Sequence, residues 1–249
     1  MLSVLIAVVA RRARSLSTSG AVAAVFVGTV AITAGWSWGM MLLSFFVSST
    51  ALSRIDERRK AERVGSIVAK GGERDARQVL ANGGVFSLAA LGQILSPSPV
   101  WHALGAGALA AVAADTWATE IGTWAGKDPI SIVSGKRVPM GTSGAVTGVG
   151  SLAGVLGALF MAAVAALANW PVSFAAVALG GIGGALADSV LGGTLQARRW
   201  CDSCAKSTER AVHDCGATTR PAGGLAGFDN DAVNAVCSAV GALIAFALS

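Results

Sequence analysis

The chain has 249 residues, of which 53% are apolar and only 13% are charged, about half the charged share of an ordinary soluble domain. A mean hydropathy of +0.63 excludes an intrinsically disordered chain, which needs low hydrophobicity and high net charge, and it disfavours a soluble globule. The formal net charge of +5 does not predict a nucleic-acid partner, because no basic patch with interleaved aromatic residues accompanies it.

Charged residues are confined to a minor part of the sequence. Lys, Arg, Asp and Glu are absent from the stretches 1–10, 15–53, 78–114, 138–187 and 232–249. The three long stretches contain 39, 37 and 50 residues. Since a membrane-spanning helix needs about 20 residues, each long stretch predicts a hairpin of two spans. Each also has a break near its middle that contains Gly, Pro or Trp, as expected for the turn of such a hairpin.

In chain order, the pattern predicts a short apolar segment followed by about seven membrane spans. The segment covers 1–10, and the spans lie near 20–35, 38–53, 78–95, 100–118, 143–168, 172–195 and 230–248. Arg residues follow the first segment instead of preceding it, so we expect a retained segment and not a cleaved signal peptide. The predicted fold class is all-α: one integral-membrane domain over 1–249, a polytopic helical bundle with Gly- and Ala-rich packing.

The distribution of positive charge predicts the topology. All 19 Lys and Arg residues fall in four segments that lie on the same side of the predicted spans, 11–14, 54–77, 115–137 and 188–231. The positive-inside rule places these segments in the cytoplasm of a multi-pass protein of the cell membrane. The expected cytoplasmic loops are 54–77, 119–142 and 196–229, and we expect the active site on that side.

Small polar and acidic residues stand at the cytoplasmic ends of the predicted spans, where a passive scaffold would have apolar residues with Lys and Arg. Ionisable groups at membrane depth are costly and indicate a functional site. Helix capping is the alternative, and it accounts for Asp229 and Ser143. It does not account for Asp115 and Asp188, which end their spans where the helix dipole disfavours an anion. Other polar residues at these span ends are Ser48, Ser49, Asn82, Thr116, Asn230 and Asn234.

A stripe with strict i+4 spacing runs along the sixth predicted span. It consists of Gly180, Gly184, Asp188, Gly192 and Gln196. Small residues at this spacing let two helix backbones approach closely, which explains the glycines but not the Asp and the Gln. A packed seam that opens into a site at its cytoplasmic end explains both.

Two loops have the composition of phosphate sites. The first contains Lys70, Gly71, Gly72 and Arg74. Gly lets the backbone approach an anion, and Arg donates two parallel hydrogen bonds to phosphate oxygens. The second contains Lys136, Arg137, Gly141, Thr142, Ser143 and Gly144 and leads into a predicted helix, whose free N–H groups attract anions. The alternative is a pair of ordinary surface loops with charges.

Carboxylates at the same span ends predict a magnesium site. Mg²⁺ typically takes one or two carboxylates together with substrate phosphates, as in nucleotide-dependent phosphoryl transfer. The candidate ligands are Asp115, Glu120, Asp188, Asp229 and Asp231.

The third cytoplasmic loop contains a second candidate metal site. Cys201-x-x-Cys204 and His213-x-Cys215 supply four ligands within fifteen residues, a spacing that resembles a zinc knuckle. Disulfides are rare on the cytoplasmic side, which favours structural Zn²⁺. The alternative is a set of free thiols with an unrelated His. Cys237, within the last span, is expected to be a small apolar residue.

Four long motifs carry a family resemblance. They are Lys70–Gly84, Ala114–Gly122, Val138–Gly144 and Asp229–Asn234. In this order they resemble the integral-membrane family of transmembrane protein 19 and plant phytyl-phosphate kinase, and the similarity covers about residues 15–249. More distantly, Asp115–Gly122 and the Gly-Thr-Ser-Gly loop are similar to polyprenol kinases and CTP-using cytidylyltransferases.

The resemblance implies a membrane kinase that phosphorylates an isoprenyl monophosphate, such as phytyl or geranylgeranyl phosphate, to the diphosphate. The implied partners are that lipid, a nucleoside triphosphate (CTP or ATP), Mg²⁺ and membrane lipids, with a homodimer left open. We expect Asp115, Glu120, Lys70 and Arg74 to be catalytic. Contacts to substrate or nucleotide are expected from Ser48, Ser49, Gly71, Gly72, Asn82, Thr116, Lys136, Arg137, Gly141, Thr142, Ser143, Gly144, Gln196, Asn230 and Asn234.

Two other functions remain open at this point. The first is a lipid or polyprenol kinase or a nucleotidyltransferase that uses the same site with another acceptor. The second is a transporter or lipid carrier, which would place its polar groups near the bilayer midplane rather than at one interface.

Overall fold

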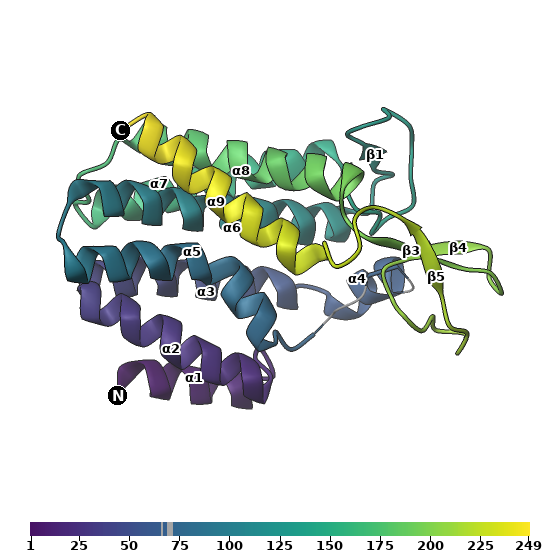
Figure 1. Cartoon of the computed structure of the whole chain (residues 1–249), viewed down its shortest axis with the longest axis horizontal. Coiled ribbons are helices and arrows are strands. Elements are labelled where there is room, and N and C mark those ends of the chain that lie inside the picture. The colour runs from purple at the N-terminus through teal and green to yellow at the C-terminus, as the bar shows by residue number, and fades with distance from the viewer. Residues whose placement is uncertain (66, 69–71) are drawn as a thin grey trace.

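The computed structural model describes residues 1–65, 67, 68 and 72–249, and it is predominantly helical (Figure 1). The helices are α1 (Leu2–Arg12), α2 (Thr18–Ala34), α3 (Trp36–Arg54), α4 (Glu57–Val64), α5 (Ala76–Leu95), α6 (Pro99–Ala125), α7 (Gly148–Leu167), α8 (Phe174–Thr194) and α9 (Asn230–Ala247). Among the described residues, two small antiparallel sheets join β1 (Ile130–Ser131) with β2 (Ala145–Val146), and β3 (Arg198–Cys201) with β4 (Lys206–Thr208) and β5 (Arg220–Gly223). The all-α fold class is thereby confirmed.

Each of the seven predicted spans corresponds to one helix, but fewer meet the requirements of length and composition for crossing a membrane. Among the described residues, α5, α7, α8 and α9 meet them, and α3 with α4 counts as a fifth if this pair, bent by 75°, is one broken span. α2 is apolar but has 17 residues, and α6 is not among the candidates. Four to five candidate spans are therefore supported, and seven remains a prediction.

The charged loops gather at one end of the bundle, opposite to the two chain termini (Figure 1). α4, β1 and the β3–β5 sheet lie at this end. This agrees with the prediction that all segments containing Lys and Arg lie on the same side of the spans. The cytoplasmic assignment of this end stays a prediction. At 11 residues, α1 is roughly 16 Å long and thus too short to cross the apolar core of a bilayer.

α6 is the centre of the bundle. It packs against α3, α5, α7, α8 and α9, and every residue from Gly105 to Ala114 is buried. The backbones of α6, α8 and α9 approach each other closely because small residues line the contacts between these helices. A Cβ added at Gly184 would lie 2.4 Å from Ala111 Cβ, and one added at Gly107 would lie 2.3 Å from the Gly241 carbonyl oxygen. The predicted glycine seam is thus a contact of α8 with α6 and α9.

Two helix boundaries differ by more than two residues from those predicted. α6 continues to Ala125, so residues 119–125 of the predicted loop 119–142 are helical and build one wall of the cavity described below. α7 begins at Gly148 and not at residue 143, because Thr147 caps it by accepting from the Gly150 N–H, and β2 pairs with β1 just before it. Ser143 is therefore not a helix cap, whereas Asp229 caps α9 as expected.

Candidate functional site

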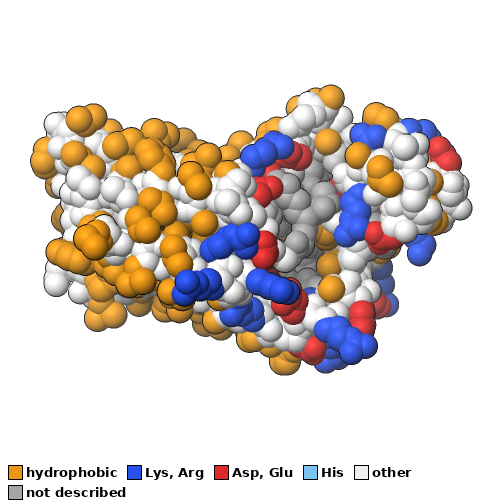
Figure 2. All heavy atoms as spheres, turned by 90° about the horizontal axis from the view of Figure 1, so that it is seen from below, with side chains coloured by type: hydrophobic (Ala, Val, Ile, Leu, Met, Phe, Trp, Pro, Cys, Tyr) orange, Lys and Arg blue, Asp and Glu red, His pale blue; other side chains and the backbone are white. Residues whose placement is uncertain are grey.

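A cavity of about 1020 Å³ opens at the charged end of the bundle. Figure 2 shows charged side chains of both signs gathered at this end, whereas the exposed side chains of the other end are mainly hydrophobic. Most of the predicted site residues line the cavity, although they come from widely separated parts of the chain. They are Gly72, Arg74, Asn82, Asp115, Thr116, Glu120, Gly141, Thr142, Ser143, Gly144, Asp188, Gln196, Asn230 and Asn234.

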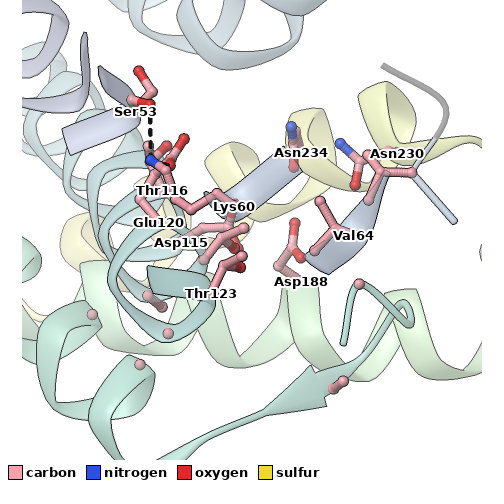
Figure 3. A pocket seen from close by; sticks show the side chains of 18 of the residues that line it. Ser53, Lys60, Val64, Asp115, Thr116, Glu120, Thr123, Asp188, Asn230 and Asn234 are labelled. Carbon is pink, nitrogen blue, oxygen red and sulfur yellow. Dashed lines mark hydrogen bonds and ion pairs between the residues drawn. The ribbon is translucent and has the colours of Figure 1, made fainter. Parts of the chain in front are cut away.

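Asp115 of α6 and Asp188 of α8 lie side by side in this cavity, with Asn230 and Asn234 on its α9 side (Figure 3). The two carboxyl groups are close enough to hydrogen-bond each other. Asp188 Oδ2 is buried without a hydrogen-bond partner among the described atoms. Two adjacent carboxylates, one of which has a buried oxygen without a hydrogen-bond partner, are the arrangement that a bound cation would satisfy.

Lys60 of α4 forms an ion pair with Glu120 of α6 at one edge of the cavity (Figure 3). The ammonium also donates to the carbonyl oxygens of Leu52 and Ser53, both at 2.8 Å, so it satisfies free carbonyls at the C-terminal end of α3. Its side chain is 8% exposed and that of Glu120 is 22% exposed. The Glu120 carboxylate is therefore already neutralised by a buried cation.

Arg74 lies at the junction between the cavity and a second, apolar groove. Its backbone is anchored by the N–H of Ser17, which donates to the Arg74 carbonyl at 3.0 Å, and its Nη1 donates to Thr50 Oγ1 at 3.2 Å. Burial lowers the pKa of the guanidinium, and the negative charge of Glu120 acts in the opposite direction. The guanidinium of Arg74 is thus fixed in a position where it could bind an anionic ligand.

The loop Gly141–Gly144 forms the opposite wall of the cavity. Gly144 has a φ of +73° and lies so close to α8 that an added Cβ would be 2.4 Å from Gly193 Cα. Ser143 Oγ donates to Glu209 Oε1 at 2.8 Å, and Gln196 Nε2 donates to the same oxygen at 2.6 Å. The loop is thereby fixed between α8 and the β3–β5 segment.

Several predicted residues lie outside the cavity lining. The loop Gly141–Gly144 reaches α7 only through β2 and the Thr147 cap, so the helix begins later than predicted. Thr147, Gly150 and Ser151 at the N-terminus of α7 line the cavity, and the expected anion site there stays a prediction. Lys136 and Arg137 are exposed, and Arg137 pairs with Asp128 at 3.4 Å. Neither residue lines the cavity.

The other predicted site residues that do not line the cavity lie on α3, at the start of α9 and in the loop before α5. Ser48 donates to a carbonyl of its own helix, and Ser49 is fully buried. Asp229 and Asp231, expected as Mg²⁺ ligands, are instead ion partners of Arg77 at 2.9 and 3.7 Å, because the N-terminus of α9 faces that side chain. None of these four lines the cavity. Lys70 and Gly71 lie outside the described residues.

Lys60 and Glu209 are among the cavity residues that were not predicted. The sequence signal for Lys60 was only its place in a cationic segment, where eight Lys and Arg residues serve as a topology signal. Glu209 has no local signal, because it reaches the cavity only through the folding of the loop between α8 and α9.

The four predicted zinc ligands are brought together away from the cavity. The ligand atoms of Cys201, Cys204, His213 and Cys215 all lie within 4.8 Å of one another. The Ala217 backbone N–H and, next, the His213 ring lower the pKa of the Cys215 thiol to about 6. Hydrogen bonding to Cys215 is the largest cause that raises the pKa of Cys204 to about 11.

Comparison with known proteins gives consistent matches. A family model described as integral membrane protein DUF92 matches residues 1–242. Protein PGR of Arabidopsis thaliana is 32% identical over 95% of this chain and 90% of its own length. An uncharacterised membrane protein of Methanocaldococcus jannaschii is 31% identical over 75% of this chain and 77% of its own length. The chloroplastic protein VTE6 of Arabidopsis thaliana is 32% identical over 60% of this chain and 46% of its own length. No solved structure matches.

Proposed function

Since the chain belongs to the integral membrane protein DUF92 family, the family of transmembrane protein 19 and phytyl-phosphate kinase, we propose that it phosphorylates an isoprenyl monophosphate to the diphosphate. The phosphoryl donor is a nucleoside triphosphate, CTP or ATP, and the reaction uses Mg²⁺. The site lies on the cytoplasmic side of the cell membrane, in accordance with the positive-inside rule.

The observation that carries this proposal is that a polar cavity and an apolar groove meet at the same three residues. Arg74, Gln78 and Asn82 line both. The other groove residues are mainly apolar side chains of α1, α2 and α3, such as Ile6, Val27, Leu42 and Phe45. A ligand with an apolar tail and an anionic head fits this junction, with its phosphate beside Arg74.

The carboxylate pair Asp115 and Asp188 provides a place for the metal ion that phosphoryl transfer requires. Asp115 and Asp188 fit Mg²⁺, because that ion takes one or two carboxylates plus phosphate oxygens and because Asp188 Oδ2 is an orphaned buried acceptor. A bound Mg²⁺ would neutralise the charge of the nucleotide phosphates. Asn230, Asn234 and the loop Gly141–Gly144 line the same space and offer amide and backbone hydrogen bonds to the nucleotide.

The reaction needs little covalent participation by the protein. An oxygen of the lipid phosphate attacks the γ-phosphorus, a new P–O bond forms, and the bond between that phosphorus and the bridging oxygen to the β-phosphate breaks. The products are the isoprenyl diphosphate and the nucleoside diphosphate. Since the acceptor phosphate is already an anion, no general base is required, and catalysis consists of positioning and charge neutralisation. Arg74 would position the acceptor.

The test is an acceptor screen with the full-length protein purified in detergent. Phytyl and geranylgeranyl phosphates are supplied with Mg²⁺ and either CTP or ATP, and products are identified by mass spectrometry. The proposal expects a diphosphate from wild type, and loss of that product in Asp115→Asn and Asp188→Asn. Asp128→Asn is the matched control, because Asp128 is exposed and outside the cavity lining.

The same screen separates the rival functions. A lipid monophosphate from an isoprenyl alcohol would indicate an alcohol kinase, and a nucleotide-linked lipid would indicate a nucleotidyltransferase. Lipid flux without nucleotide, unchanged in Asp115→Asn, would indicate a carrier. No diphosphate from any isoprenyl monophosphate, while a control kinase works in the same assay, would refute the proposal.

A further inference from the structure

The segment between α8 and α9 contains a cluster that the proposed reaction does not use. Cys201 ends β3, Cys204 lies in the turn to β4, and His213 and Cys215 lie in the following loop. All four cysteines of the chain are free of disulfides, and three of them meet here. They are joined by one of only two histidines in the sequence.

The spacing of the ligand atoms fits one tetrahedral ion. Zn²⁺ binds thiolate sulfur at about 2.3 Å and imidazole nitrogen at about 2.0–2.1 Å, which sets tetrahedral edges of about 3.8 Å for S···S and about 3.6 Å for N···S. Cys201 Sγ and Cys215 Sγ are 3.6 Å apart, and His213 Nδ1 is 3.3 Å from Cys215 Sγ. A disulfide would need about 2.05 Å between the sulfur atoms.

The surrounding segment has no hydrophobic core of its own. Within residues 197–229, all of which the structure describes, the buried side chains are Cys201, Thr208, His213 and Thr219. No large aliphatic or aromatic side chain is among them, and all of β5 is exposed. Small irregular segments of this kind are usually held together by a metal or by disulfides, because apolar burial cannot offset the entropy of ordering the chain.

The two ligand pairs have matching turns. Ala205 follows the first pair with a φ of +49°, and Gly216 follows the second with a φ of +83°. Each left-handed residue turns the chain sharply, so that Cys204 can face Cys201 and Cys215 can face His213. The backbone is thus bent at both places toward the same point.

We propose that Cys201, Cys204, His213 and Cys215 bind one Zn²⁺ as a structural centre, and that this centre holds Glu209 at the cavity wall. Glu209 lies between the second and third ligands. Its backbone N–H donates to the Ile67 carbonyl at 2.8 Å, and its carboxylate accepts hydrogen bonds from Ser143 and Gln196. Glu209 is a positioning residue for the glycine loop. The metal site itself does not depend on the proposed kinase activity.

The first experiment measures metal content, without any substrate. The full-length protein is purified in detergent without chelators. Elemental analysis by inductively coupled plasma mass spectrometry should find about one zinc per chain. Cys204→Ser and His213→Ala should lose most of it. Cys237→Ala should retain it, because Cys237 is buried in α9, outside the cluster. Wild type that neither contains zinc nor takes it up when it is added, or stoichiometric zinc in Cys204→Ser, would overturn the proposal.

The second experiment uses only the wild-type protein, so that misfolding of a variant does not decide the outcome. A strong chelator should expose three additional thiols to a thiol reagent and should increase trypsin cleavage at Arg199, Lys206 or Arg210 by tenfold or more. Added Zn²⁺ should reverse both effects. Thiol reactivity and cleavage that do not change on chelation would contradict a structural centre. Because neither readout involves phosphoryl transfer, their failure is distinct from failure of the proposed kinase.

Discussion

Asp115 of α6 and Asp188 of α8 meet carboxyl to carboxyl at the charged end of the bundle. Two carboxylates at this separation repel each other when both are ionised, and they are kept together where a cation or a proton is shared. The contact exists because α6 and α8 approach closely along their Gly and Ala residues. Both Asp residues lie inside their helices and not at the predicted ends, since α6 continues to Ala125 and α8 to Thr194. This pair is the feature on which the first prediction depends.

Replacing either carboxylate by its amide should abolish most activity without destabilising the fold. We expect Asp115→Asn and Asp188→Asn each to lower kcat by roughly 100-fold or more, the size of effect seen when one preorganised electrostatic contact is lost. The thermal midpoint should stay at or above that of wild type, because the change removes repulsion. Steady-state kinetics at several Mg²⁺ concentrations and thermal unfolding check this, and near-normal kcat in both variants would contradict the assignment.

Arg74 should act on the lipid phosphate. We expect Arg74→Ala to raise KM for the isoprenyl phosphate by about tenfold, which corresponds to about 1.4 kcal/mol, with a smaller effect on KM for the nucleotide. Arg77→Ala is the matched control, because Arg77 is exposed, pairs with Asp229 and lies outside the cavity lining. Equal changes in the two variants would show that general surface charge, and not a specific contact, is responsible.

In the Lys60–Glu120 pair, each buried charge should stabilise the fold mainly by neutralising the other. Lys60→Met leaves Glu120 without its buried partner, so we expect a loss of about 3 kcal/mol in the free energy of unfolding, the lower end of the range for broken buried pairs. The double variant Lys60→Met with Glu120→Gln should recover much of this loss. Unfolding in detergent measures all three proteins, and a double variant less stable than the single one would rule out compensation.

The glycine seam should tolerate no side chain. Gly184→Ala would place its Cβ 2.4 Å from that of Ala111, so we expect destabilisation of about 1–3 kcal/mol from overpacking. Gly84→Ala is the control within another helix, since nothing lies within 4 Å of a Cβ there. It should be neutral or stabilise by up to about 1 kcal/mol. Thermal midpoints of the two variants give the comparison, and a neutral Gly184→Ala would contradict the close approach.

The predicted topology can be tested by labelling. We expect Lys127→Cys, in the loop after α6, to react with a membrane-impermeant maleimide in inside-out vesicles only. Trp36→Cys, at the exposed tip between α2 and α3, should react in right-side-out vesicles only. The unmodified protein serves as the background. Labelling of Lys127→Cys in right-side-out vesicles would show that the orientation is the reverse of the predicted one.

Much of the architecture could be predicted because it depends on local composition. Charge-free stretches of 37–50 residues with central breaks are hairpins of helices whatever the tertiary contacts are. The Cys-x-x-Cys and His-x-Cys spacing likewise placed its four ligands together, because each pair is close in sequence and one short loop connects the pairs. The cap at Asp229 is also local, since its carboxylate accepts from a backbone N–H three residues further on.

What only the tertiary structure decided is which polar residues share the cavity. Asp188 lies against Asp115, whereas the carboxylate of Asp231 pairs with Arg77. The spacing of these residues in the sequence contains no information on which carboxylate enters the cavity. Lys60 and Glu209 reach the cavity through a bent helix pair and a folded loop. Charge segregation and helix positions follow from the hydropathy of each segment, but the site depends on the directions of side chains from separate segments, and these are set by how closely the small residues of α6, α8 and α9 let the helices pack.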